Sequence, residues 1–232
     1  MFSRLTRACY RAWWLLQWRL LASATTEREI IEAFHRLYFE RGKIDGTAWA
    51  GTRWRGRPVA QCPFDLMAIS RLIQEQLPIA VLEIGTGWGG SALFYADNGA
   101  APVVTIDHLS YHEPFDPGTG IVSIVGDSLA TLSRAHVRHT LREQSALVIL
   151  DGNHQQTIVY EECEAYAPYV RIGAHLIVCD TQFDGHPIPW ERGPGAWDAV
   201  EQFLAVHPEF VQDRDVEPML TFNPRGWLKR VR

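Results

Sequence analysis

The sequence predicts an α/β domain with a mostly parallel sheet, preceded by a helical extension. Three observations lead to this prediction. Short apolar segments alternate with amphipathic segments through the middle of the chain, which is typical of a parallel sheet with helices on both faces. A glycine-rich turn directly follows one of these apolar segments, as in nucleotide-binding α/β folds. Two short apolar segments near the end predict a C-terminal β-hairpin, which gives seven strands in all.

Length, composition and charge agree with one such domain. The chain has 232 residues, of which 47% are hydrophobic and 21% charged, an ordinary globular balance. A net charge of −5 argues against a nucleic-acid partner, which would require a basic face. The cysteines lack C-x-x-C spacing, so we expect reduced thiols in a cytoplasmic protein; they are Cys9, Cys62, Cys163 and Cys179.

Residues 1–22 combine arginines with tryptophans and leucines. Arg19 interrupts the long apolar run, which is then too short to span a bilayer. No small-residue cleavage site follows, which argues against a signal peptide. Two interpretations stay open. The segment is either a helix that packs on the core or on a neighbouring subunit, or a basic helix that lies on the inner membrane surface as a peripheral contact.

The next segments predict the order of elements up to the end of the central sheet. Residues 25–41 have helical spacing and a cap at Thr25 or Thr26, so we expect a helical extension over 1–42 and the main domain over 43–232. An ordered loop and a helix should follow, and then alternating strands and helices. The loop is expected at 42–63, the helices at 64–77, 89–97, 128–141 and 155–170, and the strands at 80–84, 102–106, 121–125, 146–150 and 174–179.

The pattern changes after the fifth of these strands. Residues 181–195 are rich in glycine and proline and form a loop at the carboxyl end of a strand, where α/β proteins place functional groups. A helix is expected at 196–206. Two final strands, near 209–213 and 219–231, are expected to be joined through a hairpin turn at 223–226.

The glycine turn predicts a nucleotide-type cofactor. A buried strand that runs into glycines and then a helix directs backbone N–H groups at a ligand. The segment satisfies G-x-G-x-x-G, which predicts a dinucleotide. It also satisfies acid-x-G-x-G-x-G, which resembles the first motif of S-adenosylmethionine (SAM) methyltransferases. The cofactor-binding residues expected here are Glu83, Gly85, Thr86, Gly87, Gly89 and Ser91.

Two later strand ends extend this cofactor site. Asp107 lies roughly 20 residues beyond the turn, where an acid accepts hydrogen bonds from ribose hydroxyls in NAD and SAM sites alike. Asp127 and Ser128 follow the third strand, where a SAM methyltransferase contacts adenine, although either could simply cap a helix. The late position of the glycine turn and the terminal hairpin favour SAM over NAD.

Polar residues at the ends of the fourth and fifth strands predict the chemistry. Asp151 and Asp180 should lie close together at neighbouring strand ends and could bind a hard divalent cation, with Asp151 also reaching the cofactor. His154, three residues past Asp151, could take a proton from a substrate hydroxyl, since imidazole titrates near neutral pH. The alternative for each of the three is a purely structural role as a cap or turn former.

The order of these motifs resembles the cephalosporin hydroxylase/rhamnosyl O-methyltransferase family. The resemblance covers roughly residues 45–231 and leaves the first 40 residues without a specific match. Its motifs, in order, are Cys62-Pro63-Phe64-Asp65-Leu66, Glu83–Ser91, Gly126-Asp127-Ser128, Leu150–His154, Asp180-Thr181, Gly193-Pro194-Gly195 with Ala199-Val200 and Phe203-Leu204, His207–Phe210, and Gly226–Arg230.

The resemblance implies a Rossmann-like class I methyltransferase that uses SAM and Mg²⁺. Known members act on cephalosporin-type intermediates and glycolipid sugars, and related macrolide-sugar enzymes hold magnesium with strand-end acids. It implies metal ligands at Asp151 and Asp180 and a base at His154. One departure concerns the metal: the family often has an acid immediately before the second aspartate, where this chain has Cys179, and Asp184 or water would then complete the shell.

We therefore expect a SAM-dependent O-methyltransferase that modifies a hydroxyl of a sugar or secondary metabolite. Aromatic residues of the 182–195 loop, with Trp197 nearby, would cover such an acceptor. The relatives are oligomeric, which implies a homo-oligomer. Two other functions stay open: an NAD-linked oxidoreductase, and a non-catalytic partner protein that keeps the fold and has lost its metal site.

Overall fold

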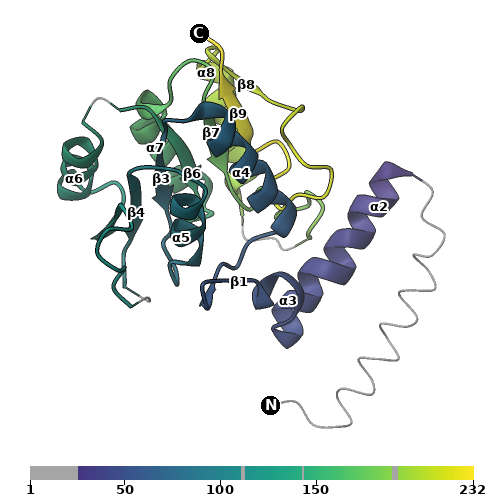
Figure 1. Ribbon diagram of the computed structural model, residues 1–232. Coiled ribbons are helices and arrows are strands. Elements are labelled where there is room, and N and C mark those ends of the chain that lie inside the picture. Colours follow the sequence, from purple (N-terminus) through teal and green to yellow (C-terminus); the bar gives the residue numbers. More distant parts are fainter. Residues whose placement is uncertain (1–25, 111–112, 143, 190–192) are drawn as a thin grey trace.

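The computed structural model describes residues 26–110, 113–142, 144–189 and 193–232. In these residues, seven strands form one sheet in the order β5-β4-β3-β6-β7-β9-β8 (Figure 1). All pairs from β5 to β7 are parallel, and β9 is antiparallel to both of its neighbours. This confirms the predicted sheet. The strands are β3 (Ala80–Ile84), β4 (Val103–Asp107), β5 (Ile121–Val125), β6 (Ala146–Leu150), β7 (His175–Val178), β8 (Phe210–Gln212) and β9 (Trp227–Arg230).

The central strands are buried on both faces, which explains why their sequences are nearly continuous apolar runs. Every residue of β3, β6 and β7 is buried. The five predicted central strands agree with the structure to within one residue at each end. From β3 the chain continues to β4 on one side, and from β6 it continues to β7 on the other side, so the direction of strand order reverses between β3 and β6. Such a reversal is a topological switch point, and α/β folds bind ligands at the carboxyl ends of the strands there.

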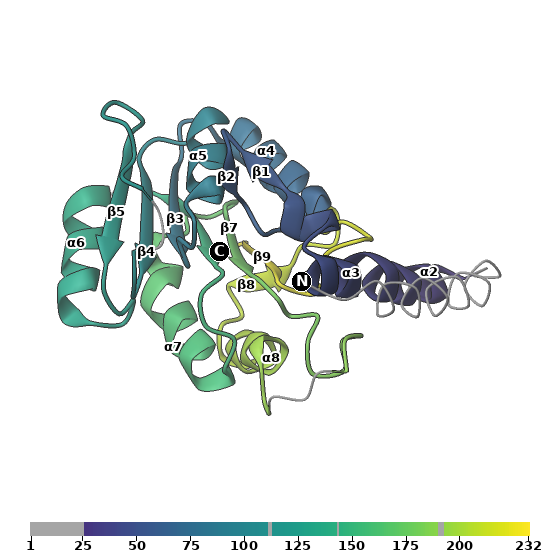
Figure 2. The same ribbon diagram turned by 90° about the horizontal axis from the view of Figure 1, so that it is seen from below.

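Helices cover both faces of the sheet (Figure 2). One face carries α4 (Pro63–Gln76) and α5 (Gly90–Asp97), and the other carries α7 (Gln156–Tyr166) and α8 (Ala196–Val206). A short 3₁₀ turn, η3 (Ala167–Tyr169), follows α7, and α6 (Thr131–Leu141) contacts β4 and β5. The predicted helices are therefore confirmed, with α6 beginning three residues later than expected.

A continuous helical segment precedes the domain. It consists of α2 (Glu27–Phe34), the π-helical turn η1 (His35–Phe39) and α3 (Glu40–Asp45). Its start is a capping box: Thr26 Oγ1 accepts from Glu29 N–H, and Glu29 Oε2 accepts from Thr26 N–H. The two interpretations of residues 1–22 lie outside the described residues. Nowhere in the described part of the chain is a helix long and apolar enough to cross a membrane.

An aromatic core joins this helical segment to the domain. Phe39 is buried with Cys62, Ile188 and Phe222, and its ring packs edge-on against Phe222 at 5.1 Å between centroids. Ile188 belongs to the loop that follows β7, and Phe222 belongs to the segment that leads into β9. The N-terminal helices are thus packed against two segments that border the carboxyl ends of the strands.

Two sequence predictions are wrong in detail. The expected loop at 42–63 contains a 3₁₀ turn, η2 (Ala48–Gly51), and a small hairpin of β1 (Arg53–Trp54) and β2 (Arg57–Pro58). The expected strand at 219–231 is shortened to β9, and the turn at 223–226 begins β9 instead of forming a hairpin tip. Close backbone approach explains this position: Val178 N–H donates to Gly226 O, and a Cβ on Gly226 would lie 2.0 Å from Val178 O.

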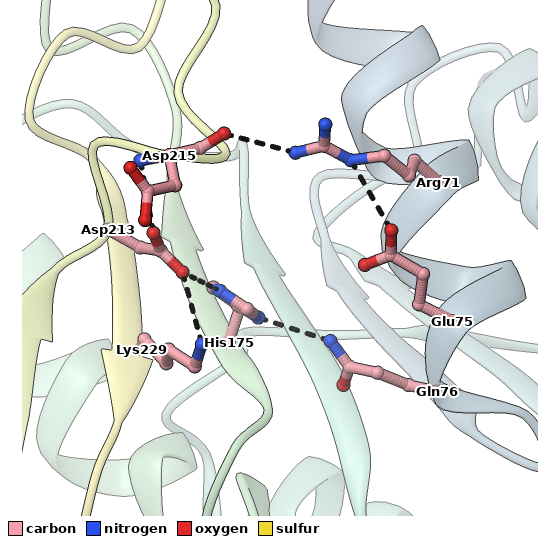
Figure 3. Close-up of polar contacts among 7 residues, drawn as sticks. All are labelled: Arg71, Glu75, Gln76, His175, Asp213, Asp215 and Lys229. Carbon is pink, nitrogen blue, oxygen red and sulfur yellow. Dashed lines mark hydrogen bonds and ion pairs between the residues drawn. The ribbon is translucent and has the colours of Figure 1, made fainter.

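A buried polar network anchors the far end of α4 to the sheet (Figure 3). His175 Nε2–H donates to Asp213 Oδ2 at 2.9 Å, and His175 Nδ1 accepts from Gln76 at 3.2 Å. Burial lowers the pKa of His175, so the ring is neutral, and Lys229 Nζ lies 3.6 Å from the Asp213 carboxylate. The network therefore fixes the carboxyl end of α4 against the sheet.

Candidate functional site

A cavity of about 550 Å³ opens at the carboxyl ends of β3, β4, β5 and β6. It lies at the switch point of the sheet, where the sequence predicts the cofactor. Most of the predicted cofactor residues line it, whereas Glu83 and Gly89 do not. The predicted residues at its wall are Gly85, Thr86, Gly87, Ser91, Asp107, Asp127, Ser128 and Asp151.

The glycine turn is shaped by close packing between β3 and β6. Gly85 has φ of +103°, and a Cβ there would lie 2.2 Å from Asp151 O, so any side chain would push the two strand ends apart. Gly89 also has positive φ and is the N-cap of α5, behind the turn. The turn is fastened by Gly87 N–H, which donates to Asp107 Oδ2 at 2.9 Å.

Glu83 supports the turn from behind. Its side chain is fully buried and accepts from Thr105 Oγ1 at 2.5 Å, and Thr105 in turn bonds Thr86 Oγ1 at 2.7 Å. Burial raises the pKa of Glu83 to about 8. Glu83 therefore supports the glycine turn through the two threonines. It is not among the residues that line the cavity, although the sequence predicts it as a cofactor-binding residue.

Asp107 and Asp127 stand at the ends of β4 and β5 and both line the cavity. Asp107 holds the glycine turn with one oxygen, as described above. Asp127 Oδ1 accepts from Leu129 N–H at 2.8 Å and stabilises a tight turn. Since α6 begins only at Thr131, with Ala130 as its N-cap, the alternative of a helix cap at Asp127 or Ser128 is wrong.

Ser128 is held by two residues of α7 that the sequence prediction missed. Its hydroxyl donates to Glu162 Oε1 at 2.6 Å, and its carbonyl accepts from the Tyr166 hydroxyl. Glu162 is buried and lines the cavity. One face of α7 is buried and otherwise apolar or aromatic, and it consists of Val159, Glu162, Cys163 and Tyr166. An acid at helical spacing on such a face was the sequence signal that could have predicted a functional role for Glu162.

Asp151 is oriented by Gln61, which precedes α4. Gln61 Nε2 donates to Asp151 Oδ2 at 2.8 Å, and the Tyr95 hydroxyl donates to Gln61 Oε1 at 3.3 Å. Burial raises the pKa of Asp151, and the negative charge of Asp180 raises it further. The two aspartates are thus close enough to repel each other, as the sequence prediction required.

Asp180 is positioned through a chain of contacts from α4. Its backbone N–H donates to Asn223 Oδ1 at 2.9 Å, and Asn223 Nδ2 donates to Asp65 Oδ2 at 3.3 Å. Asp65 is buried at the start of α4 and also accepts from Phe222 N–H. Asp180 itself has φ of +57°, a left-handed conformation that such contacts must hold in place. The motif Cys62-Pro63-Phe64-Asp65 therefore has a structural role that its sequence alone did not reveal.

His154 lies beside Asp180, in the loop between β6 and α7. Its Nε2 is 3.4 Å from Asp180 Oδ2, and its ring packs near Phe183 with 6.0 Å between centroids. The structure thus pairs His154 with Asp180, and Asp151 lines the cavity at the end of the neighbouring strand, whereas His154 and Asp180 are not among the residues of the cavity wall. A histidine next to a carboxylate can accept a proton and keep it, because the carboxylate stabilises the imidazolium.

Comparison with known proteins decides the family. Residues 47–231 match the family model described as rhamnosyl O-methyltransferase/CmcI. The chain belongs to this family. It is 27% identical over 212 residues to the rhamnosyl O-methyltransferase of Mycobacterium leprae (strain TN), covering 87% of this chain and 90% of the relative. It is 25% identical over 215 residues to that of Mycobacterium bovis (strain BCG / Pasteur 1173P2), covering 87% and 85%.

Solved structures of CmcI share the fold. An apo structure of CmcI superposes with a TM-score of 0.59 at 20% identity, covering 78% of this chain and 76% of that one. A CmcI structure described with Mg and SAM gives a TM-score of 0.59 at 19% identity, covering 78% and 77%. The Rossmann-like methyltransferase fold predicted from the sequence is therefore confirmed.

In this member of the rhamnosyl O-methyltransferase/CmcI family, a cysteine directly precedes Asp180. Burial and the neighbouring acids raise the pKa of Cys179 well above its usual range, so the thiol stays neutral and is a poor magnesium ligand. Across the described residues, no group of three or more His, Cys, Asp or Glu side chains could hold a metal. The two oxygen-bearing acids fit Mg²⁺ bound by Asp151 and Asp180, with water and acceptor oxygens in the other positions.

The loop after β7 packs against the start of α8. Trp197 is stacked on His186 with 3.8 Å between ring centroids, and the Arg225 guanidinium lies 4.7 Å from the Trp197 ring. The expectation that aromatic side chains of this region cover an acceptor stays a prediction. A Cβ on Gly195 would lie 2.4 Å from Asp184 Oδ2, which places that carboxylate against the same helix start.

Proposed function

We propose that this protein is a SAM-dependent O-methyltransferase that methylates a hydroxyl of a sugar or secondary metabolite with the help of Mg²⁺. The observation that carries the proposal is the cavity at the switch point of the sheet, which Asp151 lines and beside which His154 and Asp180 form a pair after the neighbouring strand ends. Membership of an O-methyltransferase family supports the reaction type. The rhamnosyl O-methyltransferase relatives support a sugar hydroxyl as the acceptor.

The cavity suits the parts of SAM. The glycine turn offers backbone N–H groups where β3 ends, Asp107 offers carboxylate oxygens for ribose hydroxyls, and the segment at Asp127 and Ser128 lies where the sequence predicts adenine. SAM, when bound, supplies a methyl group on a sulfonium ion, which is electrophilic without further activation. The task left to the protein is to orient the acceptor oxygen and remove its proton.

His154 takes that proton on its imidazole ring. Its Nε2 lies 3.4 Å from Asp180 Oδ2, and the carboxylate stabilises the imidazolium that results. Asp151 and Asp180 would hold the magnesium ion, which would lower the pKa of the acceptor hydroxyl. Gln61 and Asn223 keep the two aspartates oriented for this role through the hydrogen bonds described above.

Calorimetry with S-adenosylhomocysteine (SAH) and NADH tests the cofactor. We expect SAH to bind and NADH not to bind, because the cavity combines the methyltransferase-type acid-x-G-x-G-x-G turn with paired carboxylates at the reaction end. Binding of NADH without binding of SAH would instead support the NAD-linked oxidoreductase that the sequence left open. Binding of SAH without turnover on any hydroxyl acceptor would support the non-catalytic alternative.

The remaining expectations concern assembly and location. A homo-oligomer, a membrane contact through residues 1–22 and a cytoplasmic location stay predictions from the sequence. Sedimentation of the full chain, and flotation with vesicles containing anionic lipid, would test the first two.

A further inference from the structure

We infer that Glu162 determines cofactor specificity by accepting a hydrogen bond from the exocyclic amino group of the adenine ring. The inference rests on the proposed function, since it names the part of SAM that this side chain recognises. Glu162 lies on α7, which is not among the strand ends where the sequence predicts cofactor contacts. It approaches the cavity from the side of the segment at 126–129.

The position of Glu162 matches the adenine end of the cavity. Its Oε1 accepts from the Ser128 hydroxyl at 2.6 Å, so the carboxyl group is fixed beside the segment that follows β5. Asp107, which suits the ribose, lies at the end of the neighbouring strand β4. Leu129 and Ile158 line the same region and provide apolar surfaces for the faces of a flat base.

The second carboxyl oxygen calls for a partner that the described residues do not supply. Glu162 is 2% exposed, and Oε2 makes no hydrogen bond within the described part of the chain. A buried acceptor without a donor is unfavourable, and native proteins rarely leave one unexplained. Burial correspondingly raises the pKa of Glu162 to about 7. A donor brought by the ligand would remove the penalty.

The adenine amino group is the donor that fits. Its N–H bonds lie in the plane of the base, at the edge opposite the sugar, so a base held between Leu129 and Ile158 would present them to a carboxylate at the wall. Hypoxanthine differs at this edge by having a carbonyl oxygen in place of the amino group. A carboxylate that accepts from adenine would repel that oxygen.

Calorimetry with SAH and its deaminated analogue S-inosylhomocysteine tests the inference. We expect the wild-type protein to prefer SAH by about tenfold or more, since a lost charged hydrogen bond corresponds to at least that factor. Glu162→Met removes both oxygens at similar size and should bring the two affinities to within about twofold. Glu162→Gln should narrow the preference as well, because its amide can donate to the carbonyl of hypoxanthine.

Ser128→Ala is the matched control. It removes the partner of Oε1 and leaves Oε2 in place, so it should keep the preference for SAH even if both affinities fall. An SAH preference that persists unchanged in Glu162→Gln and Glu162→Met would overturn the inference and show that Glu162 only supports Ser128. A wild-type protein that binds SAH without preference would overturn it too. Failure of the wild-type protein to bind SAH at all would instead remove the proposed function on which it rests.

Discussion

Cys179 is buried directly before Asp180, and its thiol is neutral. The resemblance found in the sequence implies that an acid often stands at this position, which would be a third carboxylate beside Asp151 and Asp180. In the proposed function, the two aspartates and water would hold the magnesium ion, and a third carboxylate would strengthen its binding.

We expect Cys179→Glu to tighten magnesium binding by about tenfold, because a third carboxylate adds charge and an oxygen ligand beside Asp180. Titration calorimetry with Mg²⁺ in the presence of SAH measures the change. Cys179→Gln is the control, since it has the same size without the charge. Equal magnesium affinities for the two variants would show that position 179 does not face the cation.

Among the elements, α4 connects the polar network around His175 to the strand ends that carry Asp151 and Asp180. Its carboxyl end is held by Gln76 in the network around His175 (Figure 3), and its amino end carries Asp65. Asp65 reaches Asp180 through Asn223, which lies on the turn that begins β9. Two segments distant in sequence from Asp180, α4 and the turn at 223–226, thus hold this residue in its left-handed conformation.

Asn223→Ala tests this connection. The change leaves the Asp180 N–H and one acceptor position of Asp65 without a partner, so we expect the free energy of unfolding to fall by about 1–3 kcal/mol. Since Asp180 would lose its orientation, kcat should fall at least tenfold while SAH affinity stays the same. Urea denaturation and steady-state kinetics measure the two effects.

Asn98→Ala is the control for that experiment. Asn98 follows α5, away from the reaction edge, and its amide donates to Phe94 O at 2.8 Å. This variant should lose stability and keep kcat. If Asn223→Ala behaves in the same way, the connection to Asp180 is only structural.

The elements also show what the sequence could predict. The spacing of apolar residues along the chain is a local property. It predicted the central strands to within one residue at each end, and it predicted α8 with the bounds that the structure has. The strand-end rule likewise predicted that Asp151 and Asp180 follow neighbouring strand ends, as the pairing of β6 and β7 shows. Gln61, Asp65 and Glu162 escaped prediction because their roles depend on which helix face packs against which strand end. The turn at 223–226 was misplaced for a similar reason, because its position depends on contact with Val178.

For the whole molecule, buried acids are gathered in and behind the carboxyl ends of the strands. Burial raises the pKa of Glu83 to about 8 and the pKa values of Asp65 and Glu162 to about 7. The folded protein therefore binds more protons than the unfolded chain between about pH 4.5 and 8, and stability is lost as the pH rises through these values. His175 acts in the opposite sense, because its lowered pKa reduces stability as the pH falls below its usual value.

We expect the free energy of unfolding to decrease from pH 7 to 8.5, where His175 is mostly neutral in both states and the acids dominate. Each proton that only the folded protein binds makes the free energy of unfolding fall by about 1.4 kcal/mol per pH unit. Glu83→Gln should flatten the profile by about 1–2 kcal/mol over this range, since it removes one titrating acid. Urea denaturation at several pH values measures the profile, and equal slopes for the wild type and Glu83→Gln would contradict the assignment.

The switch-point cavity is proposed to perform methyl transfer with His154 as the base. The most direct measurement is the transfer of a labelled methyl group from SAM to acceptors in a metabolite extract, comparing the wild type with His154→Ala. We predict a labelled O-methyl product with the wild type, a rate about 10²–10⁴ lower with His154→Ala, and unchanged SAH affinity. An equal rate of labelling by the two proteins would contradict the account.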